Sequence, residues 1–173
     1  MTREIGYMRN PRRLSLLSGS AEAVRTLRKA GFLVVMVTNQ SGVGRGFFPK
    51  SRVAETHRRL KALLRRQGAR LDAIYVCPHA PGEGCDCRKP KTKLVRQAAL
   101  RFRIDLRQSF VVGDKGTDVK LAKAARCQGV LVRTGYGRRE LRKLHRSGGP
   151  HPDFVARNLR SAARWILSGA LRG

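Results

Sequence analysis

The chain has 173 residues, of which 38 are lysine or arginine and 11 are aspartate or glutamate, giving a formal net charge of +27. This length suits one domain with a sizeable core, and the absence of a long apolar run predicts that no transmembrane helix is present. The first residues lack the apolar stretch of a signal peptide, and three of the four cysteines share one loop, so we expect a cytoplasmic protein.

Helical and strand patterns alternate along the chain. The predicted elements are helix 20–31, strand 32–37, helix 51–67, strand 73–76, helix 92–103, strand 109–112, helix 117–126, strand 129–133, a basic helix and loop at 138–152, an edge strand at 153–155 and a helix at 157–168. Ser20 and Thr117 are predicted helix caps, and Gly31 and Gly68 are predicted helix stops.

The pattern predicts an α/β fold. An apolar run without alternation, such as 32–37, indicates a strand that is buried on both faces. Strands that alternate with helices of this length predict parallel βα units and a doubly wound parallel sheet with helices on both faces. We expect one domain over residues 1–173, in which 153–173 forms the C-terminal strand and helix.

The positive charge predicts at least non-specific attraction to nucleic acid or another polyanion. The alternative is that arginine covers solvated helix faces and no polyanion is a partner. Because no aromatic interleaving and no nucleic-acid motif accompany the charge, the sequence favours this alternative.

One short loop gathers three cysteines and a histidine: Cys77, His79, Cys85 and Cys87. These four ligands satisfy a tetrahedral zinc ion and leave no open position, so we expect a structural zinc that fixes the direction of Arg88 and Lys89. The alternatives are a coincidence of reduced cysteines or a disulfide, and the metal-like spacing disfavours both.

Polar side chains follow three of the predicted strands, where an open α/β sheet binds its ligands. These groups are Thr38, Asn39, Gln40 and Ser41; Arg88 and Lys89, after the cysteine loop; and Asp114 and Lys115. A carboxylate beside phosphate-binding cations is suited to holding magnesium together with a phosphate ester. Each group also has a structural alternative, as a turn cap, a pair of solvated charges or a helix cap.

Several segments resemble the D-glycero-D-manno-heptose 1,7-bisphosphate phosphatases of the haloacid dehalogenase-like superfamily. Between residues 4 and 137 these segments are Val37-Thr-Asn-Gln-Ser-Gly-Val-Gly-Arg-Gly-Phe47, Cys77-Pro-His79, Cys85-Asp-Cys-Arg-Lys-Pro90, Val112-Gly-Asp-Lys115 and Val132-Arg-Thr-Gly-Tyr-Gly137. The related histidinol-phosphate phosphatases share the zinc loop. The Ser41-Gly-Val-Gly-Arg-Gly and Gly113-Asp-Lys segments favour the heptose enzymes, whereas Pro90-Lys-Thr-Lys-Leu is less decisive.

The resemblance implies a magnesium-dependent, zinc-containing phosphatase that removes the 7-phosphate of a small sugar bisphosphate, on the route to activated heptose for surface polysaccharide, and that needs no oligomer. Thr38 would hydrogen-bond the phosphoryl group, and Lys89 would neutralise its charge in the transition state. Asp114 would bind magnesium, with Asp118 behind it. The implied substrate-binding residues are Gly6, Tyr7, Asn39, Gln40, Ser41, Arg88 and Lys115.

One departure from the family is severe. The family's central first strand ends in Asp-x-Asp, whose first carboxylate attacks phosphorus and whose second is the general acid and base. The sequence aligns from Glu4, just after that motif, and contains no Asp-x-Asp pair. The resemblance therefore implies that the nucleophile and the central strand are missing from these residues.

Two explanations of this departure remain open. In the first, which the intact strand-end residues favour, the native chain begins further upstream; in the second, the truncation is real. A real truncation would leave an inactive basic module that binds polyanions through one helical face, formed by Arg138, Arg139, Arg142, Lys143 and Arg146.

Overall fold

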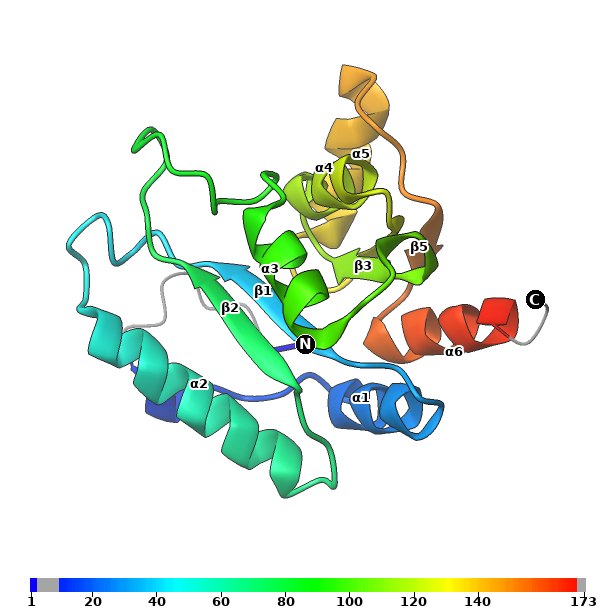
Figure 1. The fold of residues 1–173 in the computed structure, drawn as a ribbon, viewed down its shortest axis with the longest axis horizontal. Helices are drawn as coiled ribbons and strands as arrows, with labels where there is room; N and C mark the ends of the chain where they lie inside the picture. Colours follow the sequence, from blue (N-terminus) through cyan, green and yellow to red (C-terminus); the bar gives the residue numbers. More distant parts are fainter. Residues whose placement is uncertain (3–9, 171–173) are drawn as a thin grey trace. The chain divides into compact units, whose positions relative to one another are not determined.

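The structure, a computed structural model, describes residues 1–2 and 10–170, so the predicted substrate-facing turn at Gly6 and Tyr7 lies outside the described residues (Figure 1). The chain divides into two compact units, Met1–Arg88 and Lys89–Gly173. The prediction of a single domain stays a prediction. No helix in the described part of the chain is both long enough and apolar enough to cross a membrane.

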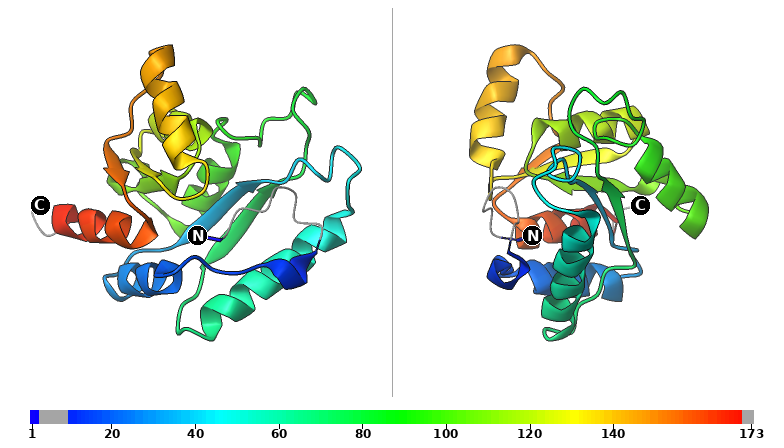
Figure 2. Two further views of the ribbon diagram at one scale, coloured as in Figure 1. Left: turned by 180° about the vertical axis from the view of Figure 1, so that it is seen from behind. Right: turned by 90° about the vertical axis from the view of Figure 1, so that its left-hand side faces the viewer.

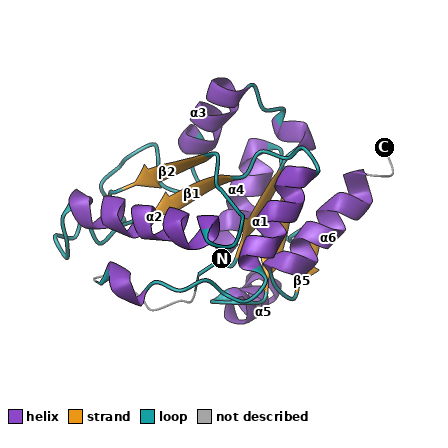
Figure 3. Cartoon of the chain, turned by 90° about the horizontal axis from the view of Figure 1, so that it is seen from below, coloured by secondary structure: helices purple, strands orange, loops and turns teal. Residues whose placement is uncertain are grey.

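The first unit is built on a parallel pair of strands, β1 (Val35–Asn39) and β2 (Ala73–Cys77). Its helices, α1 (Ser20–Lys29) and α2 (Lys50–Arg65), lie on the same side of this pair in each view (Figures 2 and 3). A short 3-10 helix, η1 (Pro11–Arg13), precedes them. The most deeply buried apolar side chains of the two helices include Ala23, Val24, Leu60 and Leu64.

The start of α1 differs from the prediction. The N-cap is Gly19, whose φ of 75° is left-handed, and no side chain caps the helix. Ser20 is already the first helical residue and is buried, so the prediction that it caps the helix is wrong. Gly31 and Gly68 follow the two helices with φ values of 88° and 67°, which confirms them as helix stops.

The first strand is less buried than expected. It spans Val35–Asn39 rather than 32–37, and all five of its residues are half-buried. Among the described residues its ladder partner is β2 alone, and both helices of the unit cover one side. A strand paired along one edge and covered on one side keeps contact with solvent, which explains the difference.

The second unit contains a three-stranded parallel sheet in the order β3 (Phe110–Gly113), β4 (Gln128–Val132) and β5 (Phe154–Ala156). Its helices are α3 (Lys93–Phe102), η2 (Leu106–Gln108), α4 (Gly116–Ala125), α5 (Gly137–Ser147) and α6 (Leu159–Ala170). The strands of the two units form separate sheets, and no strand in the described ranges joins β1 to β3. Parallel strands alternating with helices confirm the predicted α/β class.

Both faces of the three-stranded sheet are covered, as a doubly wound fold requires. Val130 and Val132 of β4 pack with Ala162 and Trp165 of α6 on one face. Leu131, between them in sequence, packs on the opposite face with side chains of α4 and α5, namely Val119, Leu141 and Leu144. Because the β4 side chains alternate between the two faces, Leu131 points to the face that α5 covers. The apolar side chains of α5 pack against it there and attach the helix to the core.

Two helices in this unit begin differently from the prediction. Asp118, in the third position of α4, accepts a hydrogen bond from the Lys115 backbone N–H at 3.2 Å, so Thr117 is not the cap and that prediction is wrong. Asn158 accepts from the Ser161 N–H at 3.0 Å, which starts α6 at Leu159 rather than at 157.

Candidate active site and metal cluster

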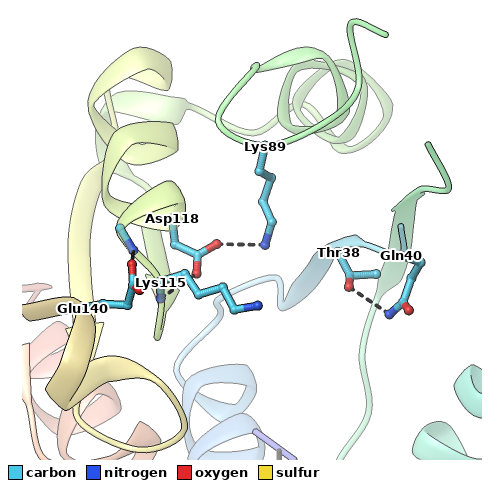
Figure 4. Close-up of polar contacts among 7 residues, drawn as sticks. Thr38, Gln40, Lys89, Lys115, Asp118 and Glu140 are labelled. Carbon is cyan, nitrogen blue, oxygen red and sulfur yellow. Dashed lines mark hydrogen bonds and ion pairs between the residues drawn. The ribbon is translucent and has the colours of Figure 1, made fainter. Parts of the chain in front are cut away.

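The carboxyl end of β1 carries the first group of predicted site residues. The Gln40 side-chain amide donates to the Thr38 hydroxyl at 3.1 Å (Figure 4), and the Gln40 backbone N–H donates to the Cys77 carbonyl at 2.7 Å. Asn39 lies opposite Cys77 in the parallel register, and Ser41 follows in the half-buried turn. The turn after β1 is therefore held against the end of β2, where the cysteine loop begins.

The four predicted zinc ligands lie together. The Cys77 sulfur lies 3.7 Å from the Cys85 sulfur and 3.7 Å from His79 Nδ1. His79 Nδ1 lies 3.3 Å from the Cys87 sulfur, and all four ligand atoms lie within 4.8 Å of one another. Zinc–ligand bonds of about 2.0–2.3 Å in a tetrahedron give ligand–ligand separations of about 3.5–3.8 Å. The donor set and its spacing therefore fit one tetrahedral zinc ion.

Backbone hydrogen bonds connect the loop of the cysteine–histidine cluster to its surroundings. The Gly44 N–H donates to the Pro78 carbonyl at 2.9 Å, and a Cβ at Gly44 would collide with Glu83 and the Ala80 backbone. Arg88 donates from Nη1 to the His79 carbonyl at 3.1 Å. The loop that carries the cluster thus holds both the turn after β1 and the Arg88 guanidinium.

The fourth cysteine is separate from the cluster. Cys127 directly precedes β4, is buried, and contacts side chains of α4. Burial raises the pKa of its thiol to about 11. This cysteine is therefore protonated near neutral pH and behaves as a small apolar core residue.

In the second unit, Lys89 and Asp118 form a largely buried ion pair. Lys89 Nζ lies 2.8 Å from Asp118 Oδ1 (Figure 4), and the other oxygen accepts from the Lys115 N–H. A Cβ at Gly113 would collide with the Asp118 carboxylate, so the last position of β3 needs glycine for this approach. Asp118 thus holds Lys89 at the carboxyl end of β3; its predicted place behind the magnesium ligand stays a prediction.

Asp114 lies immediately after β3 and is held by the turn that follows β4. Its Oδ2 accepts a hydrogen bond from the Tyr136 backbone N–H at 3.0 Å. Gly135 has a φ of 59°, and a Cβ there would collide with the same oxygen. A left-handed glycine therefore lets the 134–136 turn approach the carboxylate that is predicted to bind magnesium.

The sequence did not predict the contacts that α5 and the residue before it make with Lys115 and with the start of α4. Lys115 Nζ and Arg139 Cζ lie 4.6 and 5.1 Å from the centroid of the Tyr136 ring. Glu140 accepts from the Gly116 N–H at 3.0 Å (Figure 4), which adds a carboxylate at the start of α4. Tyr136 lies in one of the recognised segments, but nothing local in the sequence signals Glu140.

The remaining aspartates have other partners. Asp72 forms an ion pair with Arg28 and accepts from the Val34 N–H, while Asp105 accepts from the Arg107 N–H. Asp153 pairs with Lys123, and Asp86 lies between two cluster cysteines. None of these four lies directly after a strand in the described part of the chain.

Known proteins resemble this chain over most of its length. A family described as HAD-hydrolase-like matches residues 86–162. The D-glycero-β-D-manno-heptose-1,7-bisphosphate 7-phosphatase of Pseudomonas putida is 41% identical over 151 residues, which are 87% of this chain and 84% of that protein. The corresponding 7-phosphatase of Thermosynechococcus vestitus is 38% identical, covering 97% of this chain and 91% of its own.

Solved structures agree with these relatives. The heptose bisphosphate phosphatase of Bordetella bronchiseptica, crystallised with magnesium and phosphate, superposes with a TM-score of 0.86 at 36% identity, covering 94% of this chain and 89% of its own. The corresponding enzyme of Burkholderia thailandensis gives a TM-score of 0.71 at 32% identity, with 91% and 90% covered. These superpositions agree with the α/β fold that the order of strands and helices predicts.

Proposed function

We propose that this chain, which belongs to the D-glycero-D-manno-heptose-1,7-bisphosphate 7-phosphatase family of haloacid dehalogenase-like phosphatases, provides the substrate- and metal-binding residues for removing the 7-phosphate of that sugar bisphosphate. The observation that carries the proposal is the group at the carboxyl end of β3. There a largely buried cation, Lys89, is held by Asp118, and Asp114 is held by the turn at Gly135 and Tyr136.

The residues of this group have complementary electrostatic roles. Lys89 would face the phosphoryl oxygens, where a fixed ammonium stabilises the charge that develops in the transition state. Asp114 would hold magnesium, which supplies further neutralisation of phosphoryl charge when bound. Lys115 is exposed beside Tyr136 and would bind the substrate.

The first unit carries its own predicted phosphate- and substrate-binding residues. Thr38, whose hydroxyl accepts from Gln40, can donate its own proton to a phosphoryl oxygen. Asn39, Gln40 and Ser41 would line the substrate, and Arg88 would bind its second charged group. The four-residue cluster would hold a structural zinc that sets the position of Arg88.

The Asp-x-Asp pair that would supply the attacking carboxylate does not occur within the 173 residues. We infer that turnover by the covalent route needs such a pair from a strand outside these residues. Without it, Lys89 and Asp114 would bind phosphate and magnesium but would not transfer the phosphoryl group. We also propose that the protein is cytoplasmic and acts as a monomer.

The second candidate substrate is histidinol phosphate, because enzymes that act on it share the cysteine–histidine loop. The Ser41–Gly46 segment favours the heptose substrate. In this segment Gly44 contacts the loop too closely for any side chain, so the turn that would face the substrate has a specific shape.

The test compares the 173-residue chain with the same chain extended by an N-terminal strand that ends in Asp-x-Asp. We expect the extended chain to release phosphate from the heptose bisphosphate with magnesium, and to be inactive in a chelator or with its first aspartate changed to asparagine. The 173-residue chain alone should not turn over. A higher kcat/KM for histidinol phosphate would select the second candidate, and inactivity on both substrates would overturn the proposal.

A further inference from the structure

An open cavity of about 460 Å³ lies on the surface of α5, the yellow-to-orange helix of Figure 1, among the exposed side chains of Arg139, Arg142, His145 and Arg146. Because all four lining side chains are exposed and belong to one helix, the cavity is open to solvent. None of the residues assigned to the phosphatase site lines it. The cavity is therefore a separate feature of the second unit.

The helix that forms this cavity is firmly attached. Leu144 is buried with Val119 and Leu131, and Leu141 packs against the same cluster. Because these apolar side chains define the inner edge of α5, the arginines three and four positions apart project together on its outer side. The rings of His145 and His151 lie 5.7 Å apart, so the loop after α5 contributes a second imidazole close to the cavity.

The charges around the cavity are one-sided. All four lining residues are basic. The nearest carboxylate on the helix, Glu140, is 18% exposed, accepts from the Gly116 N–H at 3.0 Å, and has its other oxygen 4.0 Å from Arg139. Like charges three and four residues apart destabilise a helix, and an anion with several charges removes that repulsion.

We propose that this cavity binds a small oligophosphate, an anion with two or more linked phosphates. Guanidinium groups bind phosphate through pairs of parallel hydrogen bonds, and three of them in one cavity match several phosphates at once. Among the described residues, no Phe, Tyr or Trp side chain lines the cavity, whereas single-stranded nucleic acids are bound largely by stacking of bases on aromatic rings. The chemistry therefore favours the small anion, and this inference does not depend on the proposed phosphatase function.

The test measures binding of inorganic tripolyphosphate to the full 173-residue chain by calorimetry, near physiological salt because exposed charges are screened by ions. We expect the triple variant Arg139→Gln, Arg142→Gln, Arg146→Gln to bind more than about tenfold more weakly. The matched control replaces Arg58, Lys61 and Arg65 of α2 with glutamine. These exposed residues have the same spacing and total charge, and we expect no change in affinity.

Three further measurements keep the proposal falsifiable. Arg142→Gln alone should weaken binding with unchanged helicity, which covers the case in which the triple variant misfolds. Arg88→Gln should leave this binding event intact, because Arg88 belongs to the predicted phosphatase site and its loss leaves no buried charge unpaired. Equal losses in both triple variants would show general charge attraction. Loss in Arg88→Gln would place the anion elsewhere, and tighter binding of a single-stranded oligonucleotide through the same arginines would make this a nucleic-acid site. Each of these results would overturn the proposal.

Discussion

Lys89 and Asp118 are 29 residues apart in sequence, yet the ammonium lies 2.8 Å from the carboxylate, and the two side chains are only 16% and 9% exposed. The second carboxylate oxygen accepts from the backbone at the start of α4. A single aspartate therefore neutralises the predicted catalytic cation and fixes the helix that begins beside it. A largely buried pair of this kind depends on both partners, because either charge alone is poorly solvated.

The first prediction concerns this pair. Asp118→Asn keeps the side-chain shape but leaves the Lys89 ammonium without its carboxylate, so the free energy of unfolding should fall by about 3 kcal/mol. Urea unfolding measures the loss. The control is Glu55→Gln, since Glu55 pairs with Arg52 where both side chains are at least 40% exposed, and its loss should cost less than about 1 kcal/mol. Equal effects of the two changes would contradict the role assigned to Asp118.

The second prediction concerns the metal cluster. Purified protein should contain about one zinc ion per chain, because the four ligands complete a tetrahedral site. Cys85→Ser and Cys87→Ser should lose the metal, as measured by elemental analysis, and should unfold at a lower temperature. Cys127→Ser is the matched control, because this buried cysteine lies outside the cluster. Zinc retained in both cluster variants, or lost in the control, would rule out the assigned ligands.

The third prediction concerns acid stability. Partial burial alone would raise the pKa of the Asp153 carboxyl, but the Lys123 ammonium and the Gly129 N–H outweigh it and hold this pKa below its ordinary value. A carboxylate whose pKa is lowered in the folded state stabilises that state at pH values above its unfolded-state pKa, about 3.9. This stabilisation is lost as the pH falls through the folded-state pKa.

Asp153→Asn should therefore lower stability by about 1 kcal/mol at pH 7 and by progressively less as the pH is lowered below about 4. Unfolding curves of both proteins across this range measure the difference. The exposed Glu55→Gln variant again provides the reference. A difference between Asp153→Asn and the wild type that stays constant from pH 7 to pH 2 would show that the charge of Asp153 is not its cause.

The residues that could be predicted from the sequence are those whose relationship is local. The four cluster residues lie within eleven positions, so their spacing alone predicts a shared ligand set, and Gly31 and Gly68 end helices because of their own backbone freedom. Each of the polar groups after β1 and β3 was likewise located by the apolar run before it.

The contacts that could not be predicted join distant segments. Nothing near Lys89 signals that Asp118 is its partner, and nothing near Gly116 signals Glu140. The same limit explains the wrong caps, because Ser20 and Thr117 have suitable side chains but the backbone at Gly19 and the carboxylate of Asp118 determine where the helices begin. Partial exposure of β1 also depends on which strands and helices lie beside it.

The last prediction tests whether Gly135 is required for the position of Asp114. Gly135 and Gly148 have nearly equal φ values, 59° and 60°, so an alanine should suffer similar backbone strain at either position, about 1–2 kcal/mol. Only at Gly135 would the new Cβ collide with the Asp114 carboxylate, since nothing lies within 4 Å of the corresponding position at Gly148.

Gly135→Ala should therefore lower the free energy of unfolding by about 1–3 kcal/mol more than Gly148→Ala, because the hydrogen bond between Tyr136 N–H and Asp114 must break. The amide proton of Tyr136 should shift in the NMR spectrum of the first variant and stay in place in the second. If both alanines cost the same and leave that amide unchanged, the turn does not hold the predicted magnesium ligand.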